Sequence, residues 1–233
     1  SWEWVVAYHG AAKTGAVLNP LSSMLTTDEL RYTVNDAGAR VVIAGADKFD
    51  QLRALKTDGV VDYLVPWGGA GAGDGPTLET WMAGESAAFT IRPREAADLA
   101  VIAYTSGTTG RPKGAMQSHR AVVAAAVGTA LMAARMSDDR VINALPLFHV
   151  YGSCVMNGAL MAGSALITFP RFNEIAMLDA IATHRATIMD GVPTVYYYLL
   201  AHPDFDKYDL SSLRLCWVGG QTLPVAKSLE FTR

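Results

Sequence analysis

The chain has 233 residues, of which 51% are hydrophobic and 18% charged, and its formal net charge is −3. This composition predicts a globular protein with a buried core and excludes a disordered chain. The absence of a basic stripe disfavours nucleic acid as a partner, and no apolar run approaches the roughly 18 residues of a membrane span.

The two cysteines, Cys154 and Cys216, lie in apolar stretches of sequence. They predict buried thiols in a reducing compartment, and no cluster of cysteine and histidine indicates a metal site. The N-terminal residues do not show the charged-then-apolar pattern of a signal peptide. We therefore expect a cytoplasmic location.

The first part of the chain alternates helix-like and strand-like segments. Apolar positions at helical spacing predict a helix over residues 2–13. Thr26 and Glu29 form the capping-box pattern, which predicts a helix that runs to Asp36 and ends at Gly38. The other expected elements are strands at 16–19, 40–44 and 60–65 and a helix at 47–56.

Two segments without periodicity predict connections. Glycines crowd residues 66–76 and polar residues fill 86–98, so both are expected on the surface. A phosphate-binding interpretation of residues 66–76 is weak, because the stretch has no lysine and few hydroxyls. The sequence thus predicts a first α/β subdomain at 1–85, a connection at 86–98, and a second α/β subdomain at 99–233.

The stretch at 104–114 reads YTSGTTGRPKG and follows an apolar, strand-like run at 99–104. Glycines let backbone N–H groups turn toward an anion, hydroxyls add donors, and Lys113 adds a mobile positive charge. Residues 114–118 predict a second strand, so the loop joins two strands, unlike the common P-loop that opens a helix. The alternative is a surface hairpin rich in Gly, Ser and Thr. The residues assigned to phosphate are Thr105, Ser106, Gly107, Thr108, Thr109, Gly110 and Lys113.

The same alternation of helices and strands continues after this loop. Residues 119–135 are nearly all apolar and predict a buried helix. Asn173 predicts the N-cap of a helix, and Pro193 predicts the first turn of another that runs to Ala201. Further helices are expected at 150–161 and from 225, and strands at 141–145, 164–169, 186–189 and 214–218. This order predicts an α/β fold of mostly parallel sheets flanked by helices.

Three turns that follow predicted strands carry candidate substrate residues, because ligands gather at the carboxyl ends of strands in open α/β sheets. The turn ALPLFHVYG contains His149, for which a loop or core histidine is the common alternative. The turn DGVPTVY offers space at Gly191 and apolar walls at Val192 and Tyr196, and ordinary strand–turn–helix structure is its alternative. The turn CWVGGQTLP has adjacent glycines that would let a flat ligand approach the backbone.

Together the motifs YTSGTTGRPKG, LPLFHVYG and GVPTVYYYLL resemble the signatures of the adenylate-forming (AMP-binding) enzymes, which include acyl- and aryl-CoA synthetases, luciferase and peptide-synthetase adenylation domains. The resemblance is closest to fatty-acyl and aryl-CoA synthetases and covers nearly the whole chain. It implies part of the large N-terminal domain of that fold. It also implies catalytic roles for Lys113 and His149, an acyl site at His149, Gly191, Val192 and Tyr196, and a nucleotide–acyl junction at Gly219, Gly220 and Gln221.

The resemblance further implies a ligase that uses ATP, Mg²⁺ and CoA to activate an apolar carboxylic acid as an acyl-adenylate. It leaves open which acid reacts and whether CoA or a carrier protein accepts the acyl group. Gln221 and Thr222 depart from the family pattern, which leaves their contacts uncertain. The family's later adenine, ribose and lysine motifs are missing, so the chain is expected to be incomplete at both ends. The chain as given is therefore expected to be inactive by itself and to self-associate through its truncated edges. The alternative function is a non-catalytic truncated chain that folds and binds phosphate or nucleotide weakly at most.

Overall fold

The computed structural model describes residues 1–68, 76–105 and 111–231. Most of the predicted loop at 66–76, and residues 106–110 of the predicted phosphate loop, lie outside the described residues. The chain divides into two compact units, residues 3–120 and residues 121–233 with 1–2. The subdomain division predicted at 86–98 falls within the first unit and stays a prediction.

The unit of residues 3–120 holds two small sheets. Strands β1 and β2 pair in parallel, and strands β3 and β4 pair antiparallel, as expected for two strands joined by a short loop. The first sheet and its helices bury Leu30, Val34 and Leu55. Its elements are α1 (Trp2–Lys13), α2 (Thr27–Asp36), β1 (Val41–Gly45), α3 (Phe49–Thr57), β2 (Tyr63–Trp67), α4 (Leu78–Met82), β3 (Leu99–Thr105) and β4 (Lys113–Ser118).

Local signals place several of these elements correctly. The capping box at the start of α2 is present, because the Thr26 side chain accepts from the Glu29 backbone and the Glu29 side chain accepts from the Thr26 backbone. Residues 16–19 form no strand and contribute a single parallel bridge from Leu18 to Val101. Strand β2 begins three residues later than predicted, because Val60 still closes the end of α3 with a hydrogen bond to Leu55.

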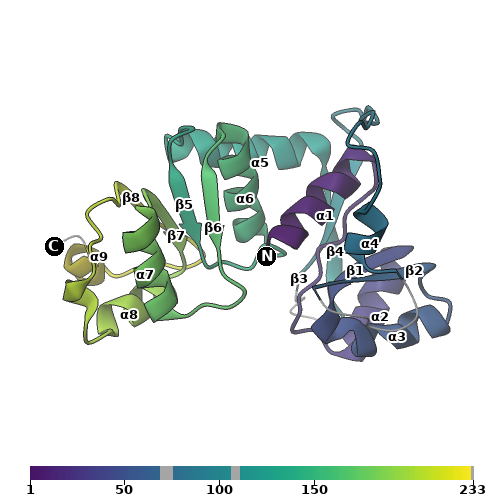
Figure 1. The fold of residues 1–233 in the computed structure, drawn as a ribbon, viewed down its shortest axis with the longest axis horizontal. Coiled ribbons are helices and arrows are strands. Elements are labelled where there is room, and N and C mark those ends of the chain that lie inside the picture. Colours follow the sequence, from purple (N-terminus) through teal and green to yellow (C-terminus); the bar gives the residue numbers. More distant parts are fainter. Residues whose placement is uncertain (69–75, 106–110, 232–233) are drawn as a thin grey trace. The chain divides into compact units, whose positions relative to one another are not determined.

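The second unit contains a four-stranded, wholly parallel sheet in the order β6-β5-β7-β8 (Figure 1). Helices alternate with its strands along the chain, as the sequence predicts. The elements are α5 (His119–Met132), β5 (Arg140–Asn143), α6 (Val150–Ala162), β6 (Ala165–Thr168), α7 (Glu174–His184), β7 (Ile188–Gly191), α8 (Pro193–Ala201), β8 (Leu215–Val218) and α9 (Val225–Phe231).

Both faces of this sheet are covered, which is the usual condition of a parallel sheet. Successive residues of a strand point to opposite faces. Ile142 and Met189 therefore pack with α7 and α8, whereas Val141 and Ile188 pack with α6.

The chain reverses direction across the sheet between β5 and β7. From β5 it passes through α6 to β6 on one side, then returns through α7 to β7 on the other. Asn143 and Asp190 are register partners at this switch point. In open α/β sheets, ligands bind outside the carboxyl ends of strands at such a point.

The N-cap of α7 is confirmed, since Asn173 Oδ1 accepts from the backbone N–H of Ala176 at 2.8 Å. Pro193 is confirmed as the first residue of α8. The prediction of a buried helix at 119–135 is wrong: in α5 only Ala126 is buried, while Leu131 is 74% exposed. An apolar composition alone does not distinguish a core helix from one that packs along a single stripe. Among the described residues, no helix is both long and apolar enough to cross a bilayer.

Gly163 and Ala134, two of the left-handed residues at helix ends in this unit, yield a paired stability prediction. Gly163 ends α6 at φ 74°, and Ala134 follows α5 at φ 43°. This conformation costs an L-residue roughly 1–2 kcal/mol but is easy for glycine. Gly163→Ala should therefore lower the free energy of unfolding by about 1 kcal/mol, and Ala134→Gly should raise it by a similar amount. Urea unfolding followed by circular dichroism measures both, and a shift in the same direction for the two variants would contradict the account.

Candidate functional site

The strand pair β3–β4 forms the base of the predicted phosphate loop. Thr105 and Lys113 are register partners at the open end of this pair, and both are exposed. Residues on directly opposed positions of an antiparallel pair share one face. The sheet therefore presents one hydroxyl and one ammonium group side by side, which is the donor set that a phosphate needs.

Side chains of helix α2 contact the end of β3 and the residue before β4. The Tyr104 hydroxyl donates to Asp36 Oδ2 at 2.5 Å, and the Tyr32 hydroxyl donates to the Pro112 carbonyl at 3.2 Å. The Arg111 guanidinium lies 5.1 Å from the centre of the Tyr32 ring, which is the range of a cation–π contact. Burial and the Asp36 carboxylate raise the pKa of Tyr104, so its hydroxyl keeps its proton.

Gly114 is required where β4 passes Tyr104. A Cβ at Gly114 would lie 2.7 Å from Ile102 Cγ2 and 3.2 Å from Tyr104 Cζ. The absence of a side chain at Gly114 thus lets the Tyr104 ring lie across β4, where its hydroxyl reaches Asp36. This observation gives a local structural reason for the glycine at the junction of the predicted loop and the predicted second strand.

In the second unit, His149 is the N-cap of α6. Its Nδ1 accepts from the backbone N–H of Tyr151 at 3.2 Å, and the side chain is exposed. A neutral imidazole that accepts at Nδ1 carries its proton on Nε2. His149 can therefore donate a hydrogen bond from Nε2 to an acceptor outside the helix.

The two other predicted turns meet at the carboxyl end of the sheet. The backbone N–H of Gly219 donates to the Gly191 carbonyl at 3.1 Å. A Cβ at Gly219 would lie 2.6 Å from Tyr151 Cε1, and a Cβ at Gly220 would lie 3.4 Å from Val192 Cγ1. The ring of Tyr151, two residues after His149, therefore lies against the turn after β8. We call His149, Tyr151, Gly191, Val192 and Gly219 the turn cluster.

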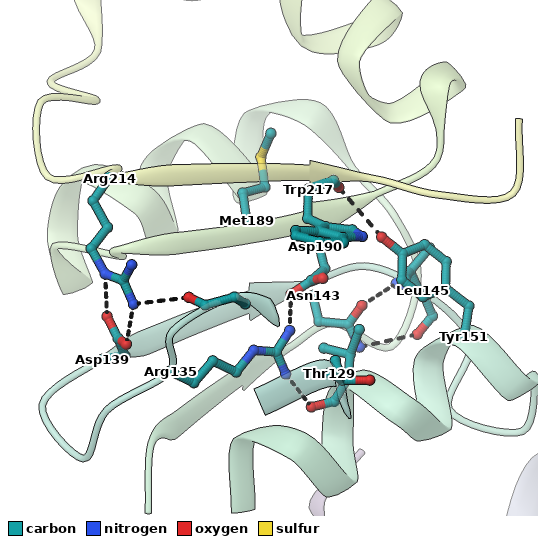
Figure 2. A network of polar contacts seen from close by, with 12 residues as sticks. Thr129, Arg135, Asp139, Asn143, Leu145, Tyr151, Met189, Asp190, Arg214 and Trp217 are labelled. Carbon is teal, nitrogen blue, oxygen red and sulfur yellow. Dashed lines mark hydrogen bonds and ion pairs between the residues drawn. The ribbon is translucent and has the colours of Figure 1, made fainter. Parts of the chain in front are cut away.

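Two tyrosines converge on one carbonyl beneath this cluster. The hydroxyls of Tyr151 and Tyr196 donate to the Trp217 carbonyl at 3.4 and 2.9 Å, and Figure 2 shows Tyr151 reaching it. Burial raises the pKa of both phenols, which therefore stay neutral. Tyr196 is only 1% exposed, so its role as an acyl-site wall stays a prediction. Gln221 is exposed, and its contact with a nucleotide likewise stays a prediction.

The structure thus brings together most of the turn residues that the sequence singled out in the second unit. It also shows residues that sequence reasoning left unassigned. Tyr32 and Asp36 anchor the strands that flank the predicted phosphate loop, and Arg135 forms a buried ion pair with Asp190. No sequence signal identified these pairs, since their members lie far apart along the chain. Within the described ranges, no three histidine, cysteine or acidic side chains lie close enough to hold a metal ion.

A covered parallel sheet with turns that meet at a switch point is typical of nucleotide- and small-molecule-binding proteins. Residues 1–232 match the family model described as "AMP-binding enzyme", and the chain belongs to that family.

Individual relatives cover the chain almost completely. It is 30% identical over 261 residues to a long-chain-fatty-acid–CoA ligase of Bacillus subtilis, with 98% of this chain and 46% of the relative covered. It is 35% identical over 238 residues to 3-[(3aS,4S,7aS)-7a-methyl-1,5-dioxo-octahydro-1H-inden-4-yl]propanoyl:CoA ligase of Mycobacterium tuberculosis, with 97% and 46% covered.

A solved structure gives the same picture. The crystal structure of ATP-bound MatB from Rhodopseudomonas palustris superposes with a TM-score of 0.87 at 34% identity, covering 100% of this chain and 45% of that one. The chain therefore spans about half the length of the relatives it matches.

The close approach of Gly219 to Tyr151 yields a coupling prediction. Gly219→Ala should displace the Tyr151 ring and lower the free energy of unfolding by about 1–3 kcal/mol, as overpacking does. In the double variant with Tyr151→Ala this clash is absent, so the two effects should not add, with a coupling energy of about 1 kcal/mol or more. Urea unfolding of the two single variants and the double variant measures it. Additive effects would show that the two side chains do not compete for space.

Proposed function

We propose that the protein containing this chain is an ATP-dependent acid–CoA ligase. The observation that carries the proposal is the meeting of the predicted turns, where Gly219 bonds to Gly191 beside the helix that His149 caps. It is supported by family membership and by relatives whose names describe CoA ligases.

The proposed reaction has two displacement steps. A carboxylate oxygen of the acid attacks the α-phosphorus of ATP, the bond to the bridging oxygen breaks, and pyrophosphate leaves with the electron pair. The sulfur of CoA then attacks the acyl carbon, the carbon–oxygen bond to phosphate breaks, and AMP leaves while the thiol proton is released. The first step supplies a good leaving group to an otherwise unreactive acid.

The phosphate role falls on the β3–β4 base. Negative charge builds on the phosphates during adenylation, so fixed donors there contribute most to the rate. Thr105 and Lys113 supply a hydroxyl and a cation at the strand ends, and the proposal extends to residues 106–110. Mg²⁺ would accompany the ATP phosphates and partly neutralise their charge.

The acid role falls on the turn cluster. His149 would donate from Nε2 to the substrate carboxylate and so orient it, because its Nδ1 is already occupied by the helix cap. Gly191 and Val192 would line the acyl group, and Gly219, Gly220 and Gln221 the junction with the nucleotide. An apolar acid, fatty or aryl, fits turns whose side chains carry no charge beyond Asp190. The reaction draws on cytoplasmic ATP and CoA, so the proposal includes that location.

The rival proposal is that these 233 residues alone bind phosphate or nucleotide weakly and turn nothing over. Exposed apolar side chains such as Val225 and Leu229, at 74% and 56%, support self-association of the isolated chain. Acid-dependent exchange of labelled pyrophosphate into ATP tests each proposal on its own protein. The ligase proposal predicts exchange by the whole protein, and the second proposal predicts none by the isolated chain. Absence of exchange in the whole protein, with a panel of fatty and aryl acids, would refute the ligase proposal.

Lys113→Ala tests the phosphate assignment in the whole protein. Loss of a charge-assisted contact of about 1.5–3 kcal/mol should raise the KM for ATP or lower kcat by roughly 10- to 100-fold. The KM for the acid should change much less. Lys207→Ala, at an exposed lysine on the second unit, is the control and should leave all constants unchanged. An effect of Lys113→Ala confined to the acid would show that the lysine does not serve the phosphates.

A further inference from the structure

The carboxyl end of β7 contains a buried ion pair. Arg135 Nη2 lies 2.6 Å from Asp190 Oδ2, and the two side chains are 0% and 1% exposed. Arg135 also donates from Nη1 to the carbonyl of Val155, inside α6, at 2.9 Å. Figure 2 shows the guanidinium lying between that helix and the sheet.

This pair is incompletely satisfied. Among the described residues, neither Asp190 Oδ1 nor Arg135 Nε has a hydrogen-bond partner. Burial raises the pKa of Asp190 to about 6, and Arg135 opposes that rise. A buried pair of this kind often contributes less to stability than apolar residues of the same volume would. Stability alone therefore gives a weak reason for its presence.

The pair lies directly below the turn cluster. Asp190 is the register partner of Asn143 on one side and of Trp217 on the other. The next residue, Gly191, accepts the hydrogen bond from Gly219. Asp190 points to the α6 face of the sheet, where Tyr151 lies in the first turn of the helix (Figure 2). Its charge is thus placed at the strand end where the acid is proposed to bind.

A substrate carboxylate and an uncompensated Asp190 would repel each other. Two like charges several ångströms apart at an effective dielectric constant of about 20 interact strongly enough to change affinity on the order of tenfold or more. We propose that Arg135 is a positioning residue for the acid site: by neutralising Asp190, it keeps the carboxyl end of β7 free of net negative charge, so that an anionic acid can bind. This inference rests on the proposed function.

Other ionisable groups around Asp190 do not supply the missing charge. Tyr151 from α6 and Tyr196 from α8 have pKa values raised by burial. Burial raises the pKa of Cys216, from β8, to about 11. These three groups are neutral up to pH 9, so Arg135 is the cation that faces Asp190 within the described part of the chain. His149 stands in the adjacent turn and is unchanged in every variant below.

The test measures the KM for a fatty acid by pyrophosphate exchange in the whole protein, between pH 6 and pH 9. In Arg135→Gln, Asp190 loses its counter-charge and its pKa rises above about 6. The acid should then bind almost normally near pH 6, where Asp190 is protonated, and about tenfold or more weakly at pH 9. The KM for ATP should stay near its wild-type value. Arg135→Lys and Arg135→Gln/Asp190→Asn should both restore a wild-type pH profile.

Arg214→Met is the matched control. Arg214 pairs with Asp139 at 2.5 Å, at the amino end of the strands of the same sheet. Its loss should lower stability without adding pH dependence to the KM for the acid. An Arg135→Gln profile that matches wild type, that rises equally at every pH, or that Asp190→Asn fails to correct would overturn the inference.

Asp190→Asn decides the question if Arg135→Gln does not fold. The proposal predicts a KM for the acid no higher than about twice the wild-type value, because the carboxylate itself contributes nothing to binding. A KM raised tenfold would overturn it. If wild-type protein shows no exchange with any acid, the proposed function fails and the inference fails with it. Active wild-type protein with an unaffected Arg135→Gln variant refutes the inference alone.

Discussion

Parallel pairing of β5, β7 and β8 is the constraint on which the candidate acid site depends. Because the three strands run in one direction, their carboxyl ends reach the same edge of the sheet. The register then sets Asn143, Asp190 and Trp217 on one rung and Gly191 on the next. The turns after β7 and β8, which are separate in the sequence, meet there through a backbone hydrogen bond from Gly219 to Gly191.

Two ion pairs hold opposite ends of this sheet, and their environments differ. Arg214 keeps the pKa of Asp139 low, at about 2, and Thr187 and the Met136 backbone also donate to that carboxylate. Asp190, in contrast, has a raised pKa and one oxygen without a partner among the described residues. The Arg214–Asp139 pair is therefore well hydrogen-bonded, and it connects loops to strands of the sheet. The Arg135–Asp190 pair places a neutralised carboxylate where the proposed substrate would bring a second carboxylate. For this reason we assign the pair to the proposed acid site and not to stabilisation of the fold.

Local chemistry in the sequence predicted much of the fold. The Thr26 capping box, the Asn173 cap and Pro193 act within one helical turn, and each marks a helix start correctly. Alternation of strands and helices also predicted the covered parallel sheet. The burial of α5 was predicted wrongly, because the partners of an apolar helix are set by tertiary packing and not by its own composition.

Sequence patterns did not predict the contacts between segments that lie far apart along the chain. Tyr104 and Asp36, or Arg135 and Asp190, become partners only once strand order and helix packing are known. The motifs therefore predicted a candidate site, while the residues that hold those motifs in place required the structure. Gly114 is intermediate: its presence in the motif was evident, but its role in making room for the Tyr104 ring was not.

The central proposal is that the protein containing this chain activates a carboxylate by attack of that carboxylate on the α-phosphorus of ATP. An acid labelled with oxygen-18 in its carboxyl group tests this claim most directly, with CoA present and the products analysed by mass spectrometry. The account predicts one labelled oxygen in AMP and none in pyrophosphate. Label in inorganic phosphate, together with ADP as the nucleotide product, would contradict it.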